Sequence, residues 1–148
     1  MSSAPGDSSE QRSAEQVILD LVGDVEGVTL ERYPLLLEDG SRMELDGFSS
    51  DPLVLCEAWA HIGAPMSAQK HKVMTDALKL VVARSSLGPS TRCKAILAFC
   101  DEDAAGHFNG STTWMAQALR QLDIDVSVVE VPPEVRESII AAQKRQYR

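Results

Sequence analysis

The apolar run PLVLCEAWAHI, residues 52–62, is the feature that most limits how this chain can fold. Turn-forming residues border it, Ser49-Ser50-Asp51 before it and Gly63-Ala64-Pro65 after it. A short apolar run between such borders is typical of a strand that is covered on both faces. We therefore predict that residues 52–62 form the central strand of a sheet.

Alternation along a strand assigns the residues of this run to two faces. One face is wholly apolar and the other carries polar groups: Val54, Cys56, Ala58 and Ala60 lie on the first, and Glu57, Trp59 and His61 on the second. Glu57 then stands in the middle of an apolar strand, where an unpaired charge is strongly unfavourable. We expect this carboxylate to be paired or to bind a cation.

Two consecutive hairpins are predicted, one before the central strand and one that includes it. Asp39-Gly40, between apolar runs, is typical of a type I′ turn with positive φ at both central residues, so strands are expected at about 28–38 and 41–48. If the next loop is centred on residues 50–52, the numbers of paired residues add up to about 103. Asp46 then lies opposite Glu57, with their Cβ atoms roughly 4.5–5.5 Å apart.

The remaining pattern alternates between helices and strands. Residues 1–13 are small and polar and are expected to be a disordered leader, so that one domain covers residues 14–148. We expect helices at about 14–22, 66–84, 111–121 and 133–146, and strands at about 93–100 and 125–131. The order α-β-β-β-α-β-α-β-α predicts an α/β fold with a mixed sheet.

Composition narrows the function classes. The 148 residues carry a formal charge of −8, with 3 basic and 13 acidic side chains in residues 1–65 (net −10) and 11 and 9 in residues 66–148 (net +2). An acidic half repels a polyanion unless metal ions neutralise part of it. Neither a membrane span nor a signal peptide is visible, so we expect a cytoplasmic protein. The three cysteines, Cys56, Cys93 and Cys100, are predicted to be reduced and buried.

The carboxylate pair predicts a metal site. Two opposed carboxylates repel each other, and a divalent cation removes both this repulsion and the cost of burying Glu57. Oxygen ligands that leave positions open suit Mg²⁺ or Mn²⁺. Structural alternatives stay open: Glu57 pairs with Lys72 or His61, or Asp46 caps the turn at Gly47.

The segments LDGFSSDPLVLCEAWAHIG and QKHKVMTDALKL resemble the restriction-endonuclease-like, or PD-(D/E)XK, nuclease superfamily, over about residues 14–100. The resemblance implies an α-β-β-β-α-β core, here extended by a further strand and C-terminal helices. It implies that Asp46, Glu57 and the backbone carbonyl of Ala58 hold Mg²⁺ or Mn²⁺, with Glu15 as an auxiliary acid. The implied activity is metal-dependent hydrolysis of phosphodiester bonds in nucleic acid, DNA in preference to RNA, by a chain that is a homodimer by analogy.

One position departs from the family pattern. The superfamily carries a lysine two residues after the second acid, and here that residue is Trp59, which cannot activate a water molecule. By the same resemblance, the lysine can stand on the following helix instead, where this chain has Lys70 and Lys72. We choose Lys72 as the catalytic lysine, with Asp76 at i+4 to orient it. His61 is a candidate proton relay or a support for the metal ligands, although a lone histidine near a strand end is more often a structural residue.

Three other interpretations stay open. Asp101, Glu102 and Asp103 follow a buried strand and look like the acidic turn of a toprim-type metal site, or else form a solvated loop. The chain is alternatively a non-catalytic nucleic-acid-binding or assembly module on the same fold. The basic end QKRQYR, with Lys144, Arg145 and Arg148, is either a phosphate-contacting tail or a frayed, solvated terminus.

Overall fold

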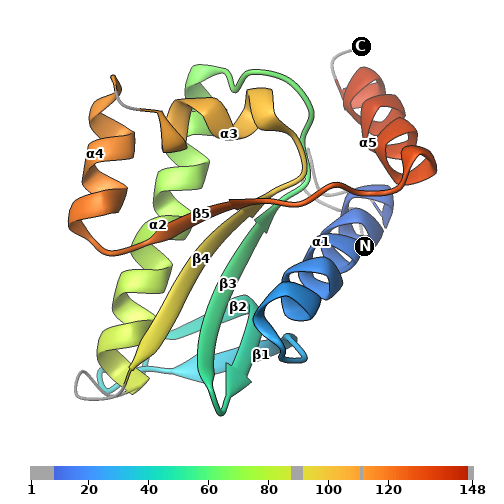
Figure 1. The fold of residues 1–148 in the computed structure, drawn as a ribbon. Helices are drawn as coiled ribbons and strands as arrows, with labels where there is room; N and C mark the ends of the chain where they lie inside the picture. Colours follow the sequence, from blue (N-terminus) through green and yellow to red (C-terminus); the bar gives the residue numbers. More distant parts are fainter. Residues whose placement is uncertain (1–8, 88–91, 111, 147–148) are drawn as a thin grey trace.

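The computed structural model of the chain describes residues 9–87, 92–110 and 112–146 (Figure 1). These residues contain five strands and five helices. In chain order they are α1 Ser9–Glu26, β1 Glu31–Leu36, β2 Arg42–Ser50, β3 Leu53–Trp59, α2 Ser67–Leu87, β4 Cys93–Phe99, α3 Glu102–Asn109, α4 Trp114–Gln121, β5 Asp125–Val128 and α5 Pro133–Gln146.

The strands form a single mixed sheet in the order β1-β2-β3-β4-β5. The first three strands are antiparallel neighbours, whereas β4 pairs with β3 and β5 pairs with β4 in parallel. β3 is the middle strand, and its residues 54–59 are all buried. The predicted α/β class with a mixed sheet is therefore confirmed, as is the central position of the apolar run.

The register of the β2–β3 hairpin is the one expected from the sequence. Gly47 pairs with Cys56 and Ser50 pairs with Leu53, so the paired residue numbers add up to 103. The turn that joins the two strands is the tight Asp51-Pro52 step, whose peptide bond is cis. Because this register holds up to Gly47, the next residues outward on the two strands are Asp46 and Glu57.

The β1–β2 turn differs from the expected type I′ turn. Gly40 has a φ of +89°, but Asp39 is not among the residues with positive φ. Leu37 accepts a hydrogen bond from the Gly40 amide (3.0 Å) and donates one to the carbonyl of Ser41 (2.9 Å). The loop therefore has three residues, 38–40, in which a turn is followed by a left-handed glycine. The Asp39 carboxylate stabilises it by accepting from the Ser41 amide (2.9 Å).

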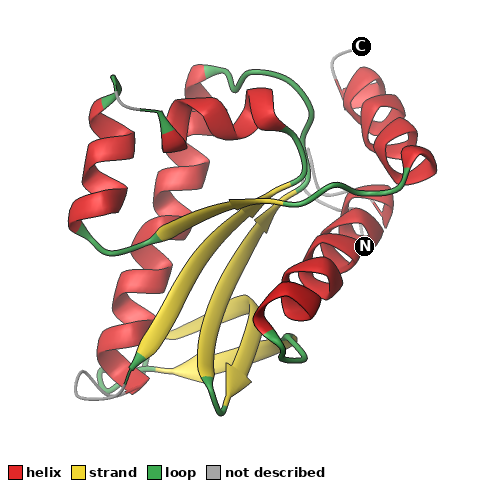
Figure 2. Cartoon of the chain, viewed as in Figure 1, coloured by secondary structure: helices red, strands yellow, loops and turns green. Residues whose placement is uncertain are grey.

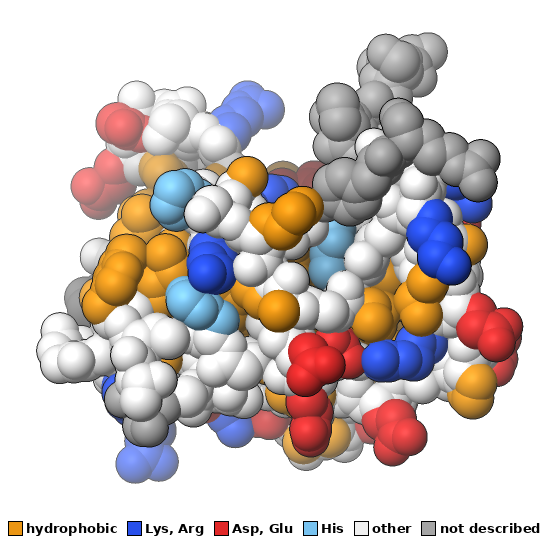
Figure 3. Space-filling model, turned by 90° about the horizontal axis from the view of Figure 1, so that it is seen from above, with side chains coloured by type: hydrophobic (Ala, Val, Ile, Leu, Met, Phe, Trp, Pro, Cys, Tyr) orange, Lys and Arg blue, Asp and Glu red, His pale blue; other side chains and the backbone are white. Residues whose placement is uncertain are grey.

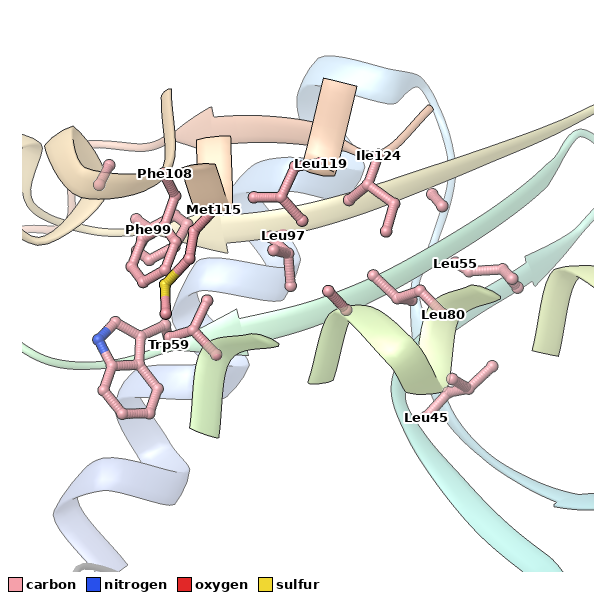
Figure 4. Close-up of a cluster of buried hydrophobic side chains, with 14 of the residues drawn as sticks. Leu45, Leu55, Trp59, Leu80, Leu97, Phe99, Phe108, Met115, Leu119 and Ile124 are labelled. Carbon is pink, nitrogen blue, oxygen red and sulfur yellow. The ribbon is translucent and has the colours of Figure 1, made fainter. Parts of the chain in front are cut away.

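Helices cover both faces of the sheet in a three-layer arrangement (Figure 2). α2, α3 and α4 lie on one face, where Leu55 and Trp59 of β3 point into a large apolar cluster (Figure 4). α1 and α5 lie on the other face, over a second cluster that contains Cys56 and Ala58. The predicted division of β3 into two faces is confirmed, although both faces contribute to an apolar core.

Several predicted boundaries were wrong. α1 begins at Ser9 and not at residue 14, and Gln11 is only 3% exposed, so residues 9–13 are not a disordered leader; residues 1–8 lie outside the described part. α3 occupies residues expected to be a loop, and α4 begins at Trp114 and not at residue 111. Residues 133–146 form the helix α5, as predicted.

Two further expectations concern the cysteines and the membrane. Cys56 and Cys100 are buried free thiols, as expected, whereas Cys93 is only half-buried. Within the described ranges, none of the helices combines the length and the apolar character that a membrane crossing requires.

Candidate functional site

Asp46 and Glu57 are joined by a pair of crossed hydrogen bonds. Glu57 Oε2 accepts from the backbone amide of Asp46 (2.7 Å), and Asp46 Oδ2 accepts from the backbone amide of Ala58 (3.0 Å). Each carboxylate thus binds the main chain of the opposite strand just beyond the last paired residues, Gly47 and Cys56. The structure brings together the two acids that the sequence predicts, with Glu57 only 2% exposed and Asp46 half-buried.

The second oxygen of Glu57 accepts from a lysine on the helix that follows β3. That lysine is Lys79, whose Nζ forms an ion pair with Glu57 Oε1. Its side chain is 30% exposed, so the pair lies at the wall of a cavity and not on open surface. The structural alternative, a buried ion pair at Glu57, is therefore present, but its partner is Lys79 and not Lys72 or His61.

The lysine that contacts Glu57 lies on the same helix as Lys72, which was chosen from the sequence. Lys79 belongs to the same polar stripe of α2 as Gln69, Lys72 and Asp76. Lys72 and Lys79 are seven residues apart, about 10 Å along a helix, and a stripe does not reveal which of the two stands opposite a given strand residue.

Glu57 and Lys79 shift each other's pKa, and the charge of Asp46 acts on both. Burial, and next the charge of Asp46, raise the pKa of Glu57 from 4.5 to about 8, against the opposing effect of Lys79. For Lys79, burial lowers the pKa, but the attraction of Glu57, the hydrogen bond to it and the charges of Asp76 and Asp46 outweigh burial and raise it. Lys79 is therefore a permanent cation at neutral pH, yet its single charge does not fully stabilise the ionised form of Glu57.

These groups face a polar cavity of about 260 Å³. Its wall is built from α1, β1, β2, β3, α2 and His61, which lies in the connection between β3 and α2. The lining residues are Gln11, Arg12, Glu15, Arg32, Glu44, Asp46, Glu57, Ala58, Trp59, His61, Lys72, Asp76 and Lys79. Every residue assigned to the site from the sequence, including the auxiliary candidates Glu15 and His61, therefore lies at one cavity.

Lys72 and Asp76 line the α2 side of this cavity. Lys72 is exposed, and it takes part in none of the ion pairs found within the described ranges. Burial raises the pKa of Asp76, while the charges of Lys72 and Lys79 act in the opposite direction. Asp76 lies between the two lysines in sequence, and the positive charge of each favours its ionised form.

Lys70, the other lysine weighed from the sequence, belongs to a different surface. It is not part of the cavity wall. Instead it lies near His107, whose pKa is lowered by burial and, to a smaller extent, by the charge of Lys70. Figure 3 looks onto the end of the molecule where β3 and β4 finish and shows basic and histidine side chains side by side there. Lys70 is therefore removed as a candidate for the lysine that works with Glu57.

His61 packs against the tryptophan that replaces the expected lysine. Its ring stacks on Trp59, with centroids 4.1 Å apart and planes 23° apart. Burial, and then the charge of Lys72, lower the pKa of His61 from 6.5 to about 4, so the ring is neutral at physiological pH. Its Nε2 lies 3.2 Å from Nε2 of Gln11, and its buried Nδ1 has no hydrogen-bond partner within residues 9–87, 92–110 and 112–146.

Asp101 has a structural role in α3 that explains its position after β4. Its carboxylate caps the helix by accepting from the Ala104 amide (3.2 Å), and it also accepts from Gly63 N (2.8 Å) and Arg136 Nη2 (3.0 Å). Glu102 and Asp103 are exposed in the first turn of α3. The toprim-type interpretation of this turn therefore finds no support, and neither does that of a simple solvated loop.

The basic C-terminal segment is helical up to Gln146. Lys144 and Arg145 lie in the last turn of α5, and Arg145 forms an ion pair with Glu10 of α1 (2.8 Å). Arg148 lies outside the described residues. This contact joins α5 to α1, so Arg145 is not a free end.

Side chains alone do not build a complete metal cage here. Within the part of the chain that the structure describes, no group of three or more His, Cys, Asp and Glu side chains is arranged to hold a metal ion. Searches of family models, curated proteins and solved structures found no match to this chain. The site geometry is therefore the basis on which a function is proposed.

Proposed function

We propose that this protein is a metal-dependent nuclease that hydrolyses phosphodiester bonds in nucleic acid, DNA in preference to RNA. The observation that carries the proposal is the convergence of Asp46, Glu57 and Lys79 on one cavity, with both carboxylates crossing between adjacent strands. Two acids and a lysine held together in a polar cavity are the groups that metal-assisted phosphoryl chemistry requires.

The donor set of the cavity suits a hard divalent cation. Asp46 and Glu57 offer carboxylate oxygens, and we assign the backbone carbonyl of Ala58 as a third ligand. Such a set leaves positions for water and a phosphate oxygen, as Mg²⁺ and Mn²⁺ prefer. The raised pKa of Glu57 agrees with this fit, because burial and then the charge of Asp46 disfavour the ionised carboxylate, and a bound cation would offset both.

The two lysines at the cavity then have defined roles beside the bound ion. A bound Mg²⁺ supplies Lewis-acid polarisation of the phosphate and lowers the pKa of its water. Lys79 favours the ionised form of Glu57 and holds its carboxylate in place, and its ammonium group stabilises negative charge that develops beside Glu57. Lys72, exposed at the α2 side, attracts the substrate phosphate. Lys79 thus takes over the catalytic role that the sequence suggested for Lys72.

The order of elements supports the same proposal. The succession α1-β1-β2-β3-α2-β4 agrees with the α-β-β-β-α-β core of restriction-endonuclease-like proteins, and α3, α4, β5 and α5 extend it. In this proposal the acids lie on the second and third strands, and the lysine has moved to the following helix. A homodimer and a cytoplasmic location belong to the proposal as well.

The decisive experiment combines metal binding with cleavage. Calorimetric titration of the full chain with Mn²⁺ and Mg²⁺ is expected to show one saturable site, and labelled DNA is expected to be cut faster than RNA of the same sequence. Asp46→Asn and Glu57→Gln should abolish both metal binding and cleavage. Asp103→Asn, an exposed acid on α3, is the matched control and should behave as wild type. Absence of saturable metal binding by the folded wild type would exclude the proposal.

A second function is favoured by one observation. Trp59, at the position of the family lysine, is 8% exposed and packed into the core, so this position is committed to stability and not to chemistry. A non-catalytic nucleic-acid-binding or assembly module on the same fold agrees with this. Binding of DNA without cleavage, unaffected by Glu57→Gln, would identify that function.

A further inference from the structure

The connection between β3 and α2, residues 60–66, joins the two elements that carry Glu57 and Lys79. Side chains from elsewhere in the chain hold its backbone. The Gly63 amide donates to Asp101, and the carbonyl of His61 accepts from the thiol of Cys100 (3.8 Å). Its geometry therefore depends on residues that are remote in sequence.

The most specific of these contacts comes from α5. Gln143 accepts a hydrogen bond from the Ile62 amide (2.7 Å) and donates one to the Ile62 carbonyl (3.0 Å). A side-chain amide that binds both polar groups of one residue fixes the position and the orientation of that peptide segment. Gln143 thus binds Ile62 as a neighbouring strand would, across 81 positions of sequence.

A second contact from α5 reaches the cavity wall through α1. Gln146 Nε2 donates to Gln11 Oε1 (2.9 Å), and the amide nitrogen of Gln11 lies 3.2 Å from His61 Nε2. An amide nitrogen donates and does not accept, so His61 Nε2 must be the acceptor. The neutral ring therefore carries its proton on Nδ1, and its tautomer is set from α5.

We propose that α5 is a working part of the site, in which Gln143 and Gln146 are positioning residues that hold His61 against Trp59 at the cavity wall. α5 lies beside α1 on the face of the sheet opposite α2 (Figure 1). It is linked to the cavity through the connection and through Gln11. The consequence of this positioning for cleavage rests on the proposed nuclease function, whereas the positioning itself does not.

The fluorescence of Trp59 tests the positioning directly. The chain has two tryptophans, and Trp114 is 69% exposed, so Trp114→Phe leaves Trp59 as the single reporter. In this background, Gln143→Met should change the intensity and the emission maximum of Trp59, because the His61 ring leaves its face. Lys144→Met, on the next residue and exposed, should leave the spectrum unchanged. An unchanged spectrum in folded Gln143→Met overturns the proposal.

Hydrogen exchange at Ile62 gives a second and milder test. In Gln143→Glu, the carboxylate still accepts from the Ile62 amide but cannot donate to its carbonyl. Protection of the Ile62 amide should therefore persist in Gln143→Glu, and any folded Gln143→Met should lose it. Equal protection in wild type, Gln143→Glu and a folded Gln143→Ala would overturn the proposal even if Gln143→Met does not fold.

The two proposals fail in different ways. If wild type binds no Mn²⁺ and cuts no DNA but Trp59 responds to Gln143→Met, the nuclease function is wrong and the positioning stands. If wild type is active and Gln143→Met alters neither Trp59 nor kcat at saturating substrate, the positioning is wrong and the nuclease function stands. If both hold, Gln143→Met should lower kcat by about tenfold or more with little change in KM.

Discussion

Lys79 of α2 donates a hydrogen bond to the almost fully buried carboxylate of Glu57 on β3, the strand that precedes α2. The contact joins α2 to β3 at the point where Asp46 also reaches across from β2. Glu57 therefore connects three of the elements that form the cavity wall, β2 through the Asp46 amide and α2 through Lys79, to its own strand β3. Both stability and chemistry should depend on it.

Removing Lys79 should destabilise the fold. Lys79→Met leaves Glu57 buried without its cation, and breaking such a pair by removing one partner is costly. Because Glu57 can take up a proton instead, we expect a loss of about 1–3 kcal/mol in the free energy of unfolding at pH 7. Urea denaturation measures it. The control is Lys94→Met, which removes the ion pair of Lys94 with Glu26 at the surface and should cost less than about 1 kcal/mol.

The pH dependence of stability should carry the signature of Glu57. A carboxyl group whose pKa is raised in the fold binds more protons folded than unfolded, so its ionisation destabilises the protein. Its contribution is fully present below about pH 4.5 and is lost as the pH rises towards about 8. The stability of wild type relative to Glu57→Gln should therefore fall across this window. A difference that stays constant from pH 4.5 to pH 8 would contradict the assignment.

Glycine at position 47 should be required for the packing of α1 over the site. A Cβ atom there would lie 2.8 Å from Leu19 Cδ2 and 3.1 Å from Leu30 Cβ. Overpacking of this kind typically costs about 1–3 kcal/mol, so Gly47→Ala should lower the midpoint of thermal unfolding. Gly106→Ala, inside α3, is the matched control, since a Cβ atom at that position would meet nothing within 4 Å. That variant should be neutral or stabilising by up to about 1 kcal/mol.

The tautomer of His61 can be measured by ¹⁵N NMR of its ring. The contact with Gln11 predicts a protonated Nδ1 and an unprotonated Nε2 at pH 7. Burial and Lys72 predict that this ring stays neutral until the pH approaches about 4. Lys72→Met should raise the pKa of His61, because it removes a nearby positive charge. A ring that titrates near its ordinary pKa of 6.5 would show that His61 is not enclosed in solution.

The sequence predicted the acids of the site but not their lysine, and the reason is geometric. Hairpin register follows from where a loop is centred, so Asp46 and Glu57 could be matched by arithmetic along one stretch of chain. Which lysine contacts Glu57 depends on the position of α2 along the sheet. That position is set by packing of its buried residues, Val73, Ala77 and Leu80, against residues distant in sequence.

Local signals also explain the missed helical residues. Asp101 begins a helix of only eight residues, which is too short for a clear apolar period, so its cap resembles part of an acidic loop. At the N-terminus, Gln11 is polar and yet buried, because it binds Gln146 from the other end of the chain. A contact across 135 positions leaves no mark in the local pattern of residues 9–13.

Substitutions of the three lysines of α2 should have different effects on kcat and KM in cleavage assays. Lys79→Met should reduce kcat by about 100-fold or more, since it removes a cation that acts beside Glu57 in the transition state. Lys72→Met should mainly raise KM, because an exposed lysine attracts the phosphate without contacting Glu57. Lys70→Met, whose charge is directed towards His107, should cut as wild type. A Lys72→Met protein with the larger loss of kcat would return the catalytic role to Lys72 and leave Lys79 as a structural partner of Glu57.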